Sequence, residues 1–323
     1  MIKRDCWCSG SNKLPFSPDY ERCGTCGTLI SMAGLPNEAY QVADDESAFY
    51  GKEYWLQHQS GDLGLPNIVE RSRRDLLDRN LHWLRTLLRY KAPPAKVLEL
   101  GCSHGSFVAL LRQAGYDASG MEMSPWVVDY AKSTFEIPVS LGPVEAADVE
   151  EGSIDVVVLM DVIEHLPFPK ETLGRAFKLL KPDGILLAQM PEFSGAATIE
   201  ELRKENPEFL GMLLPDEHLY LYSQHAAREL FNQVGTKYIN FERPVFPQHD
   251  MFFVASLQPI KPIDDMHEDT HLQTPKGRFV QGLLDQDRKI KELEEHIKVI
   301  DSDRAARLEQ ILELTKMINE RRS

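Results

Sequence analysis

The stretch that most constrains the fold is residues 96–107, where a short apolar run gives way to glycines and then to a helical pattern. The apolar run predicts a buried strand, and apolar residues at helical spacing from Phe107 onward predict a helix. Gly101 and Gly105 allow a tight turn in which the backbone approaches a ligand closely. The helix after Gly105 offers unpaired N–H groups to that ligand. The stretch therefore predicts the opening unit of a nucleotide-binding α/β domain.

A carboxylate follows at the spacing expected for a ribose contact. Glu122 ends the next apolar stretch, at about twenty residues, where an acidic side chain on the second strand meets ribose hydroxyls. The pattern Glu99-x-Gly101-x-x-x-Gly105 differs from the dinucleotide pattern G-x-G-x-x-G. It resembles motif I of the class I S-adenosylmethionine (SAM) dependent methyltransferases, E/D-x-G-x-x-x-G. The resemblance implies that Glu99, Gly101 and Gly105 line the amino-acid end of SAM and that Glu122 binds the ribose. The other residues that we assign to the SAM site are Cys102, Phe107, Met123 and Asp161.

The pattern after this unit extends the same architecture. The unbroken apolar run at 154–160 is typical of a central parallel strand that is covered on both faces. Residues from about 40 to 258 resemble class I methyltransferases, which implies an α/β, Rossmann-like fold with a seven-stranded mixed sheet. Helices are expected at 69–90, 126–135 and 175–180, a turn at 181–184, and the other strands at 96–100, 118–123, 139–141, 185–190, 238–242 and 251–257.

The candidate catalytic residues are Asp161, Glu164 and His165, directly after that central strand. Methyl transfer to a hydroxyl requires a positioned acceptor and removal of its proton. His165 is the candidate general base, because the unperturbed pKa of histidine is about 6.5. Alternatively, the three residues resemble the divalent-cation pattern E-x-x-E-H of ubiquinone-pathway O-methyltransferases, with Asp161 replacing the first glutamate, and a cation would lower the pKa of a bound hydroxyl. A third interpretation gives His165 only a structural role.

Four of the five cysteines form two close pairs, Cys6-x-Cys8 and Cys23-x-x-Cys26. In a reducing compartment such pairs more often bind tetrahedral Zn²⁺ than form disulfides. Free cysteines in a loop would not account for two pairs so close in sequence. We therefore predict a structural zinc site in residues 1–40.

The net charge of the chain bears on whether it binds nucleic acid. The net charge is −14, from 50 acidic and 36 basic residues, which argues against a nucleic-acid footprint. The arginines at 71, 73, 74 and 79 are expected on a solvated helix face. No apolar run reaches the roughly 18 residues that span a bilayer, so we expect a cytoplasmic protein. A resemblance to bacterial glycan methyltransferases, carried by the aromatic run at 49–55, implies peripheral association with a glycan-assembly complex at the inner membrane.

Two segments are expected to define the acceptor. The run Phe49-Tyr50-Gly51-Lys52-Glu53-Tyr54-Trp55 resembles the segment that links the zinc-binding N-terminus to the core in bacterial methyltransferases of sugars and glycans. Its rings either wall a sugar pocket or pack as an ordinary core. The stretch 192–219 interrupts the core pattern, and we interpret it as an acceptor lid. His218 and His249 are reserve candidates for acceptor contact.

The C-terminal part follows a seven-residue repeat. Isoleucine and leucine recur at two core positions, with Arg304 and Arg307 interrupting them. Such heptads predict a coiled coil that forms a homodimer or homotrimer; one amphipathic helix folded back on the body is the alternative. The core positions are Leu283, Leu293, Leu314, Ile290, Ile297, Ile300, Ile311 and Ile318.

These features predict five segments and one leading function. The segments are 1–40 (zinc-binding), 41–95 (aromatic and helical cap), 96–258 (SAM-binding core with its lid at about 192–219), 259–276 (linker) and 277–323 (coiled coil). The leading hypothesis is SAM-dependent O-methylation of a sugar, either the end of a surface glycan or a nucleotide-linked sugar. The alternatives are O- or C-methylation of a small quinone- or polyketide-type metabolite, and a non-catalytic scaffold.

Overall fold

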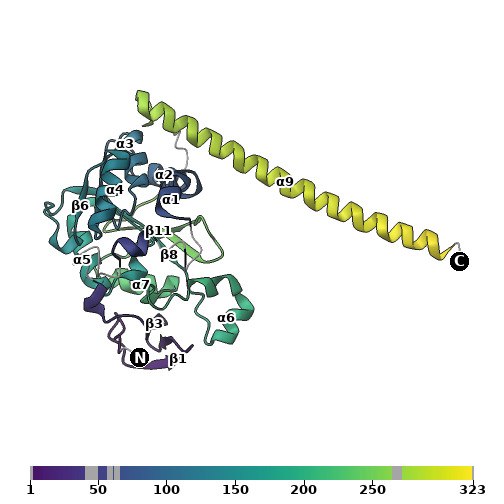
Figure 1. Cartoon of the computed structure of the whole chain (residues 1–323), viewed down its shortest axis with the longest axis horizontal. Coiled ribbons are helices and arrows are strands. Elements are labelled where there is room, and N and C mark those ends of the chain that lie inside the picture. The colour runs from purple at the N-terminus through teal and green to yellow at the C-terminus, as the bar shows by residue number, and fades with distance from the viewer. Residues whose placement is uncertain (1–2, 41–49, 57–60, 62–65, 264–270, 322–323) are drawn as a thin grey trace.

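A seven-stranded mixed sheet forms the centre of the protein (Figure 1). The computed structural model describes residues 3–40, 50–56, 61, 66–263 and 271–321. In the order β10-β11-β8-β7-β4-β5-β6, all neighbours from β8 to β6 pair in parallel, and β11 runs antiparallel to both β8 and β10. This confirms the predicted Rossmann-like mixed sheet. The strands are β4 (Lys96–Leu100), β5 (Asp117–Glu122), β6 (Val139–Leu141), β7 (Ile154–Met160), β8 (Leu180–Pro191), β10 (Tyr238–Glu242) and β11 (Asp250–Ser256).

Helices cover both faces of this sheet, as its fully buried central strand β7 requires. One face packs on apolar side chains of α2, α3 and α4, and the other packs on those of α5 and α7. The helices are α1 (Ile68–Asp75), α2 (Leu81–Tyr90), α3 (Ser106–Ala114), α4 (Pro125–Phe135), α5 (Pro169–Leu179) and α7 (Gln224–Gln233).

A second, four-stranded sheet joins the N-terminal segment to the core. It has the order β1-β2-β3-β9 and is antiparallel throughout. The strands β1 (Lys13–Pro15), β2 (Tyr20–Cys23) and β3 (Leu29–Ser31) come from the N-terminal segment, whereas β9 (Tyr220–Leu221) directly precedes α7. The stretch 192–219 carries α6 (Ile199–Glu205) and the short helix η6 (Pro207–Met212), and it packs its apolar residues against this sheet. The two segments therefore share one core.

One local prediction is wrong. The expected turn at 181–184 belongs to β8. Its residues lie at a shift in the β7–β8 register, between the pairs Ile154–Leu180 and Val156–Ile185. A bulge of this kind keeps a strand continuous although its local sequence suggests a turn. The helix expected at 69–90 is present as one continuous helical stretch, in which a π-helical turn, η3 (Leu76–Asn80), lies between α1 and α2.

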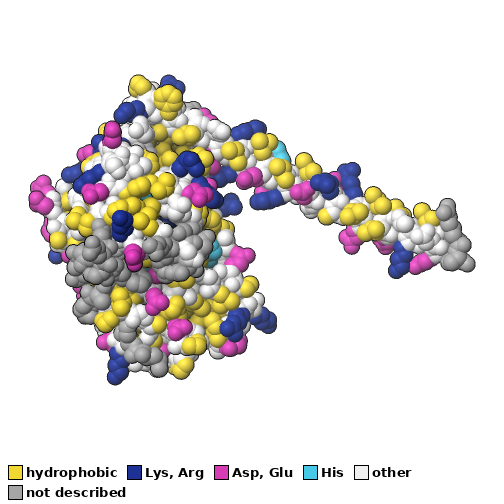
Figure 2. Space-filling model, viewed as in Figure 1, with side chains coloured by type: hydrophobic (Ala, Val, Ile, Leu, Met, Phe, Trp, Pro, Cys, Tyr) yellow, Lys and Arg dark blue, Asp and Glu magenta, His cyan; other side chains and the backbone are white. Residues whose placement is uncertain are grey.

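The C-terminal helix α9 (Pro275–Glu320) projects from the body (Figure 1). Val280 and Leu284 are buried against the body, and Asp287 pairs with Arg85 of α2 at 3.0 Å. Every residue from 288 to 320 is exposed, and hydrophobic side chains recur along this part (Figure 2). The alternative of a helix folded back on the body is therefore wrong beyond its first turns. Among the described residues, no helix is both long and apolar enough to cross a membrane.

Candidate active site

The glycine turn between β4 and α3 lies at the carboxyl edge of the sheet. Gly101 and Gly105 have φ values of 67° and 78°, a region in which side chains other than glycine are strained. A Cβ atom at Gly101 would lie 2.8 Å from a methyl carbon of Val162. The turn therefore requires glycine and brings bare backbone next to the space above the sheet.

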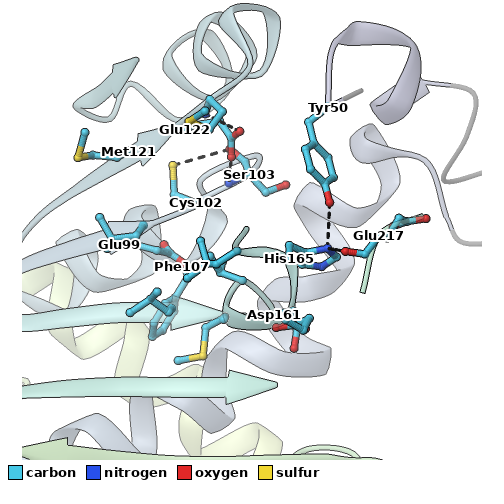
Figure 3. A pocket seen from close by; sticks show the side chains of 18 of the residues that line it. Tyr50, Glu99, Cys102, Ser103, Phe107, Met121, Glu122, Asp161, His165 and Glu217 are labelled. Carbon is cyan, nitrogen blue, oxygen red and sulfur yellow. Dashed lines mark hydrogen bonds between the residues drawn. The ribbon is translucent and has the colours of Figure 1, made fainter. Parts of the chain in front are cut away.

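Glu99 provides a buried carboxylate beside this turn (Figure 3). Within the described residues its Oε2 atom has no hydrogen-bond partner. Burial raises the pKa of Glu99 to about 8, since an ionised carboxylate loses its hydration there. A cationic ligand group would satisfy this oxygen, so the site fits the ammonium group of the methionine part of SAM.

Glu122 is held rigidly at the end of β5. Its carboxylate accepts the backbone N–H groups of Ser103, Met123 and Ser124 at 3.1, 2.7 and 3.2 Å. Burial raises the pKa of Glu122, and the three N–H donors oppose this rise. The carboxylate is thus fixed beside the glycine turn, where our hypothesis places the ribose.

One cavity of about 1020 Å³ joins the predicted SAM and catalytic residues. Gly105 is absent from its described lining. Phe107 reaches the cavity while packing on Trp83, with ring centroids 5.4 Å apart. The predicted residues that line the cavity are Glu99, Gly101, Cys102, Phe107, Glu122, Met123, Asp161, Glu164 and His165.

Asp161 is fixed by two side chains at the end of β7. Its carboxylate accepts from Arg79 at 2.8 Å and from the amide of Gln189 at 3.1 Å. Asp161 also has a positive φ of 55°, a conformation that aspartate tolerates better than most residues. Arg73 and Arg74 are exposed, as predicted for a solvated helix face. The prediction is wrong for Arg71 and Arg79, which are partly buried and line the cavity. The π-helical turn that carries Arg79 has no signal in the sequence.

Three metal-binding side chains converge next to Asp161. One ligand atom from each of Glu164, His165 and His218 lies within 4.8 Å of the others. His165 Nδ1 lies 2.9 Å from the Glu217 carbonyl, and His218 Nδ1 lies 2.7 Å from the Met212 carbonyl. A carbonyl only accepts, so both Nδ1 atoms carry the proton, and the Tyr50 hydroxyl oxygen, 3.0 Å from His165 Nδ1, is a second acceptor for that proton. Both Nε2 atoms are left as acceptors or ligands.

Burial sets the electrostatics of this cluster. It raises the pKa of Glu164 well above its usual range, and the charge of Asp161 adds to the rise. It lowers the pKa of His165 to about 3, with a further contribution from His218, and it also lowers the pKa of His218. Neither Glu164 oxygen has a hydrogen-bond partner among the described residues. The cluster thus presents a proton-holding carboxyl and two neutral imidazoles, a donor set that fits a divalent cation.

His218 lies closer to the candidate catalytic residues than the sequence indicates. It was expected only as a reserve acceptor contact, yet its ring lies 4.9 Å from that of His165. The only sequence signal is its position in the 192–219 stretch just before the Tyr220-Leu221 strand. His249 also lines the cavity, and its Nδ1 lies 2.9 Å from Asp250.

An aromatic wall faces the cluster. Tyr50, Tyr54 and Trp55 line the cavity, and Tyr50 and Glu217 converge on His165 (Figure 3). The Tyr50 and Tyr54 rings meet edge-on at 4.9 Å, and the Tyr54 hydroxyl donates to the Glu217 carboxylate at 2.7 Å. Phe49, which shares the predicted aromatic run, lies outside the described residues. The wall offers ring surfaces and hydroxyl groups together.

The four N-terminal cysteines form a second cluster, away from this cavity. Their sulfur atoms all lie within 4.8 Å of one another, and all four cysteines are free of disulfides. The Cys6–Cys8, Cys6–Cys26 and Cys8–Cys23 sulfur distances are 3.4, 3.5 and 3.6 Å. Four sulfurs at these spacings suit a tetrahedral metal.

The sheet order, the glycine turn and the buried carboxylates at its carboxyl edge define a SAM-dependent methyltransferase. The chain belongs to the methyltransferase domain family, whose model matches residues 70–240, more than half of the 323 residues. Its fold and its site are thus those of a methyltransferase domain.

Individual relatives match only parts of the chain. A ubiquinone biosynthesis O-methyltransferase of Xanthomonas campestris is 29% identical over 133 residues, which cover 39% of this chain and 55% of that protein. The enzyme of the same name from Pectobacterium atrosepticum is 31% identical over 103 residues, 28% of this chain and 39% of that one. The chain thus spans about half the length of such curated relatives. Magnesium protoporphyrin IX methyltransferase from Synechocystis, solved with bound S-adenosylhomocysteine, covers 58% of this chain and 84% of its own at 17% identity, with a TM-score of 0.42.

Proposed function

We propose that this methyltransferase transfers the methyl group to a hydroxyl oxygen that is bound beside Glu164, His165 and His218. The observation that carries the proposal is the buried cluster itself, with two unprotonated Nε2 atoms and one carboxyl without a partner among the described residues. A purely structural cluster would leave this carboxyl at a high desolvation cost. A divalent cation would satisfy all three side chains.

The protein residues divide the work between the two halves of the cavity. SAM supplies a methyl group that is activated by its sulfonium. Glu99 and the glycine turn hold its amino-acid end, and Glu122 binds the ribose. A cation at the cluster would lower the pKa of a coordinated hydroxyl. His165 and His218 keep their Nδ1 protons on backbone carbonyls and so present Nε2 to that cation. With a pKa of about 3, His165 is better suited to be a ligand than a general base.

We propose a sugar as the acceptor. Ring faces such as those of Tyr50, Tyr54 and Trp55 pack well on sugar rings, and the nearby hydroxyl and carboxylate groups can bond sugar hydroxyls. The resemblance of the aromatic segment to that of sugar- and glycan-modifying enzymes supports this class.

A phenolic small metabolite is the second candidate. It is supported by the relatives that are named ubiquinone biosynthesis O-methyltransferases. Labelled SAM offered with nucleotide-linked sugars, lipid-linked glycans and catechols separates the two candidates. Label transfer to sugars alone supports the first, and transfer to catechols alone refutes it.

The cation is tested by Mn²⁺ binding, followed by electron paramagnetic resonance. We expect one Mn²⁺ site in the wild-type protein, with an affinity that rises with pH because binding displaces the proton of Glu164, whose pKa is raised. Glu164→Gln should weaken Mn²⁺ binding at least about tenfold and leave S-adenosylhomocysteine binding nearly unchanged. Glu145→Gln, an exposed carboxylate on the lining of the same cavity, is the control. Full activity in chelator-treated enzyme that binds no Mn²⁺ would refute the cation.

A further inference from the structure

The N-terminal cysteine segment touches the acceptor side of the active site. We propose that a metal bound by its four cysteines locks this segment as a brace, which positions the loop that carries Glu217 and His218. We call residues 214–218 the acceptor-side loop. The inference rests on the proposed function, because it takes Glu217 and His218 as parts of the acceptor site.

The cysteine cluster has surroundings that suit thiolate ligands of a metal. The backbone N–H groups of Gly10 and Thr25 point at the sulfurs of Cys8 and Cys23, at 3.4 Å each. Such N–H donors stabilise negative sulfur and orient metal ligands. Four thiolates with this support favour Zn²⁺. Because Cys23 ends β2 and Cys26 precedes β3, the metal would fix the connection between these two strands.

The β2–β3 hairpin is joined to the core by backbone hydrogen bonds between β3 and β9. In the β3–β9 ladder, Leu29 pairs with Leu221 and Ile30 with Tyr220. The Ser31 N–H then donates to the Leu219 carbonyl at 3.0 Å. The ladder therefore ends directly at the acceptor-side loop.

Three hydroxyl groups of the N-terminal segment hold the loop itself. Ser31 donates to the Pro215 carbonyl at 2.5 Å, and Tyr40 donates to the Asp216 carbonyl at 2.7 Å. Tyr20, which is almost fully buried, donates to the His218 carbonyl at 3.0 Å. Three of the five carbonyls of the loop are thus bound by one partner segment. The Tyr20 bond is buried and the other two are partly buried. Such bonds fix the direction of the backbone, because breaking one leaves a carbonyl without its partner.

The acceptor-side loop in turn positions two side chains of the Glu164, His165 and His218 cluster. The Glu217 carbonyl orients His165 through Nδ1, and the next residue supplies the His218 ring. The SAM half is held differently: the N–H groups of Gly101 and Cys102 both donate to the Met121 carbonyl of β5. Loosening the brace should therefore disturb the two histidines and spare SAM binding.

The first experiment tests whether the cysteines bind a metal and whether that metal affects the acceptor-side loop. Full-length protein is loaded with Co²⁺, whose thiolate charge-transfer absorption reports the cysteine site, and is then stripped with a chelator. The experiment uses Glu164→Gln protein, so that a cation at His165 and His218 contributes little; there we expect stripping to shift the imidazole NMR signals of His165 and His218 and to raise amide hydrogen exchange in residues 214–219 at least tenfold. The His104 signal is the internal control, because that ring bonds Asp75 at 3.0 Å beside the glycine turn. Absence of the thiolate absorption in wild-type protein would refute the metal.

Single hydroxyl deletions test the brace in protein that keeps its metal. Tyr20→Phe should reproduce the histidine shifts and the faster exchange, and it should weaken Mn²⁺ binding several-fold while S-adenosylhomocysteine affinity changes less than twofold. Tyr116→Phe is the matched control, since its buried hydroxyl donates to the Lys91 carbonyl at 2.8 Å on another part of the core. Unchanged exchange and histidine signals in Tyr20→Phe would overturn the brace. If the wild-type protein binds no Mn²⁺, the cation hypothesis fails, while the exchange and NMR data still decide the brace.

Discussion

Two glutamates combine burial with an oxygen that lacks a partner among the described residues. Glu99 lies on the SAM side of the cavity and Glu164 on the acceptor side. In both, burial is the first cause of the raised pKa, because the charged form loses its water. A protein tolerates such groups where a ligand supplies the missing charge. We therefore propose that Glu99 contacts the methyl donor and that Glu164 contacts the cation on the acceptor side.

Glu99 should make SAM-site binding depend on pH. The pKa of its free carboxyl is about 8, and ligand binding requires the ionised form. The affinity for S-adenosylhomocysteine should therefore rise between pH 6 and 8, by at most about tenfold per pH unit. Glu99→Gln should weaken binding by roughly 1.5–3 kcal/mol and flatten this dependence. Calorimetry across the pH range, with Glu145→Gln as control, measures both. An equally steep pH dependence in Glu99→Gln would contradict the assignment.

The raised pKa of Glu99 should also make the stability of the unliganded protein depend on pH. A carboxyl whose pKa is raised by folding stabilises the native state below its ordinary pKa of 4.5, and this stabilisation is lost as pH rises through about 8. The unliganded protein should accordingly lose stability over this range, and S-adenosylhomocysteine should restore it.

At the scale of elements, the irregularity in β8 decides how the central sheet is completed. Gly184 is buried where the register between β7 and β8 shifts. A Cβ there would lie 3.0 Å from the Lys181 carbonyl and 3.1 Å from the Ile154 carbonyl. Both neighbours are backbone atoms in a sheet, so they cannot move independently. Glycine is required here by a close approach between strands.

Gly184→Ala should therefore destabilise the protein, by about 1–2 kcal/mol. Gly174→Ala is the matched control, because Gly174 lies inside α5 and its Cβ would meet nothing within 4 Å. That change should be neutral or stabilising by up to about 1 kcal/mol, as alanine favours the helix. Urea unfolding of both variants measures the difference. Equal stability of the two variants would argue against a constrained bulge.

At the scale of the whole molecule, α9 has two parts with different surroundings. Residues 275–287 dock on the body through Val280, Leu284 and the pair Arg85–Asp287. The remaining part exposes its heptad positions, from Ile290 at 47% to Leu314 at 59%. Such a length of apolar seam costs free energy in water unless another helix covers it. We propose that a second or third copy of this chain covers it as a coiled coil.

The two parts can be separated by truncation. A chain that ends at Asp287 should be monomeric and bind S-adenosylhomocysteine like the full chain, because the docked turns remain. A chain that ends at Thr274 should also be monomeric but should melt at a lower temperature, since the contacts of Val280 and Leu284 are lost. Light scattering and thermal unfolding measure these outcomes. A full-length chain with the mass of one copy, 36.8 kDa, would refute the coiled coil.

The strands, the glycine turn and the four-cysteine cluster were within reach of the sequence, because each depends on spacing between neighbouring residues. Period and glycine position identify β4, β7 and the turn, and cysteine spacing identifies the N-terminal pairs. Only folding brings His218 to His165, 53 positions away, and pairs β3 with β9, whose partner residues are 190 and 192 positions apart. No local pattern encodes such contacts, since they depend on how the 192–219 stretch packs against the N-terminal segment. The residues that we assign to the methyl donor can therefore be predicted from the sequence. The acceptor side of the cavity forms only when segments that are distant in sequence pack together.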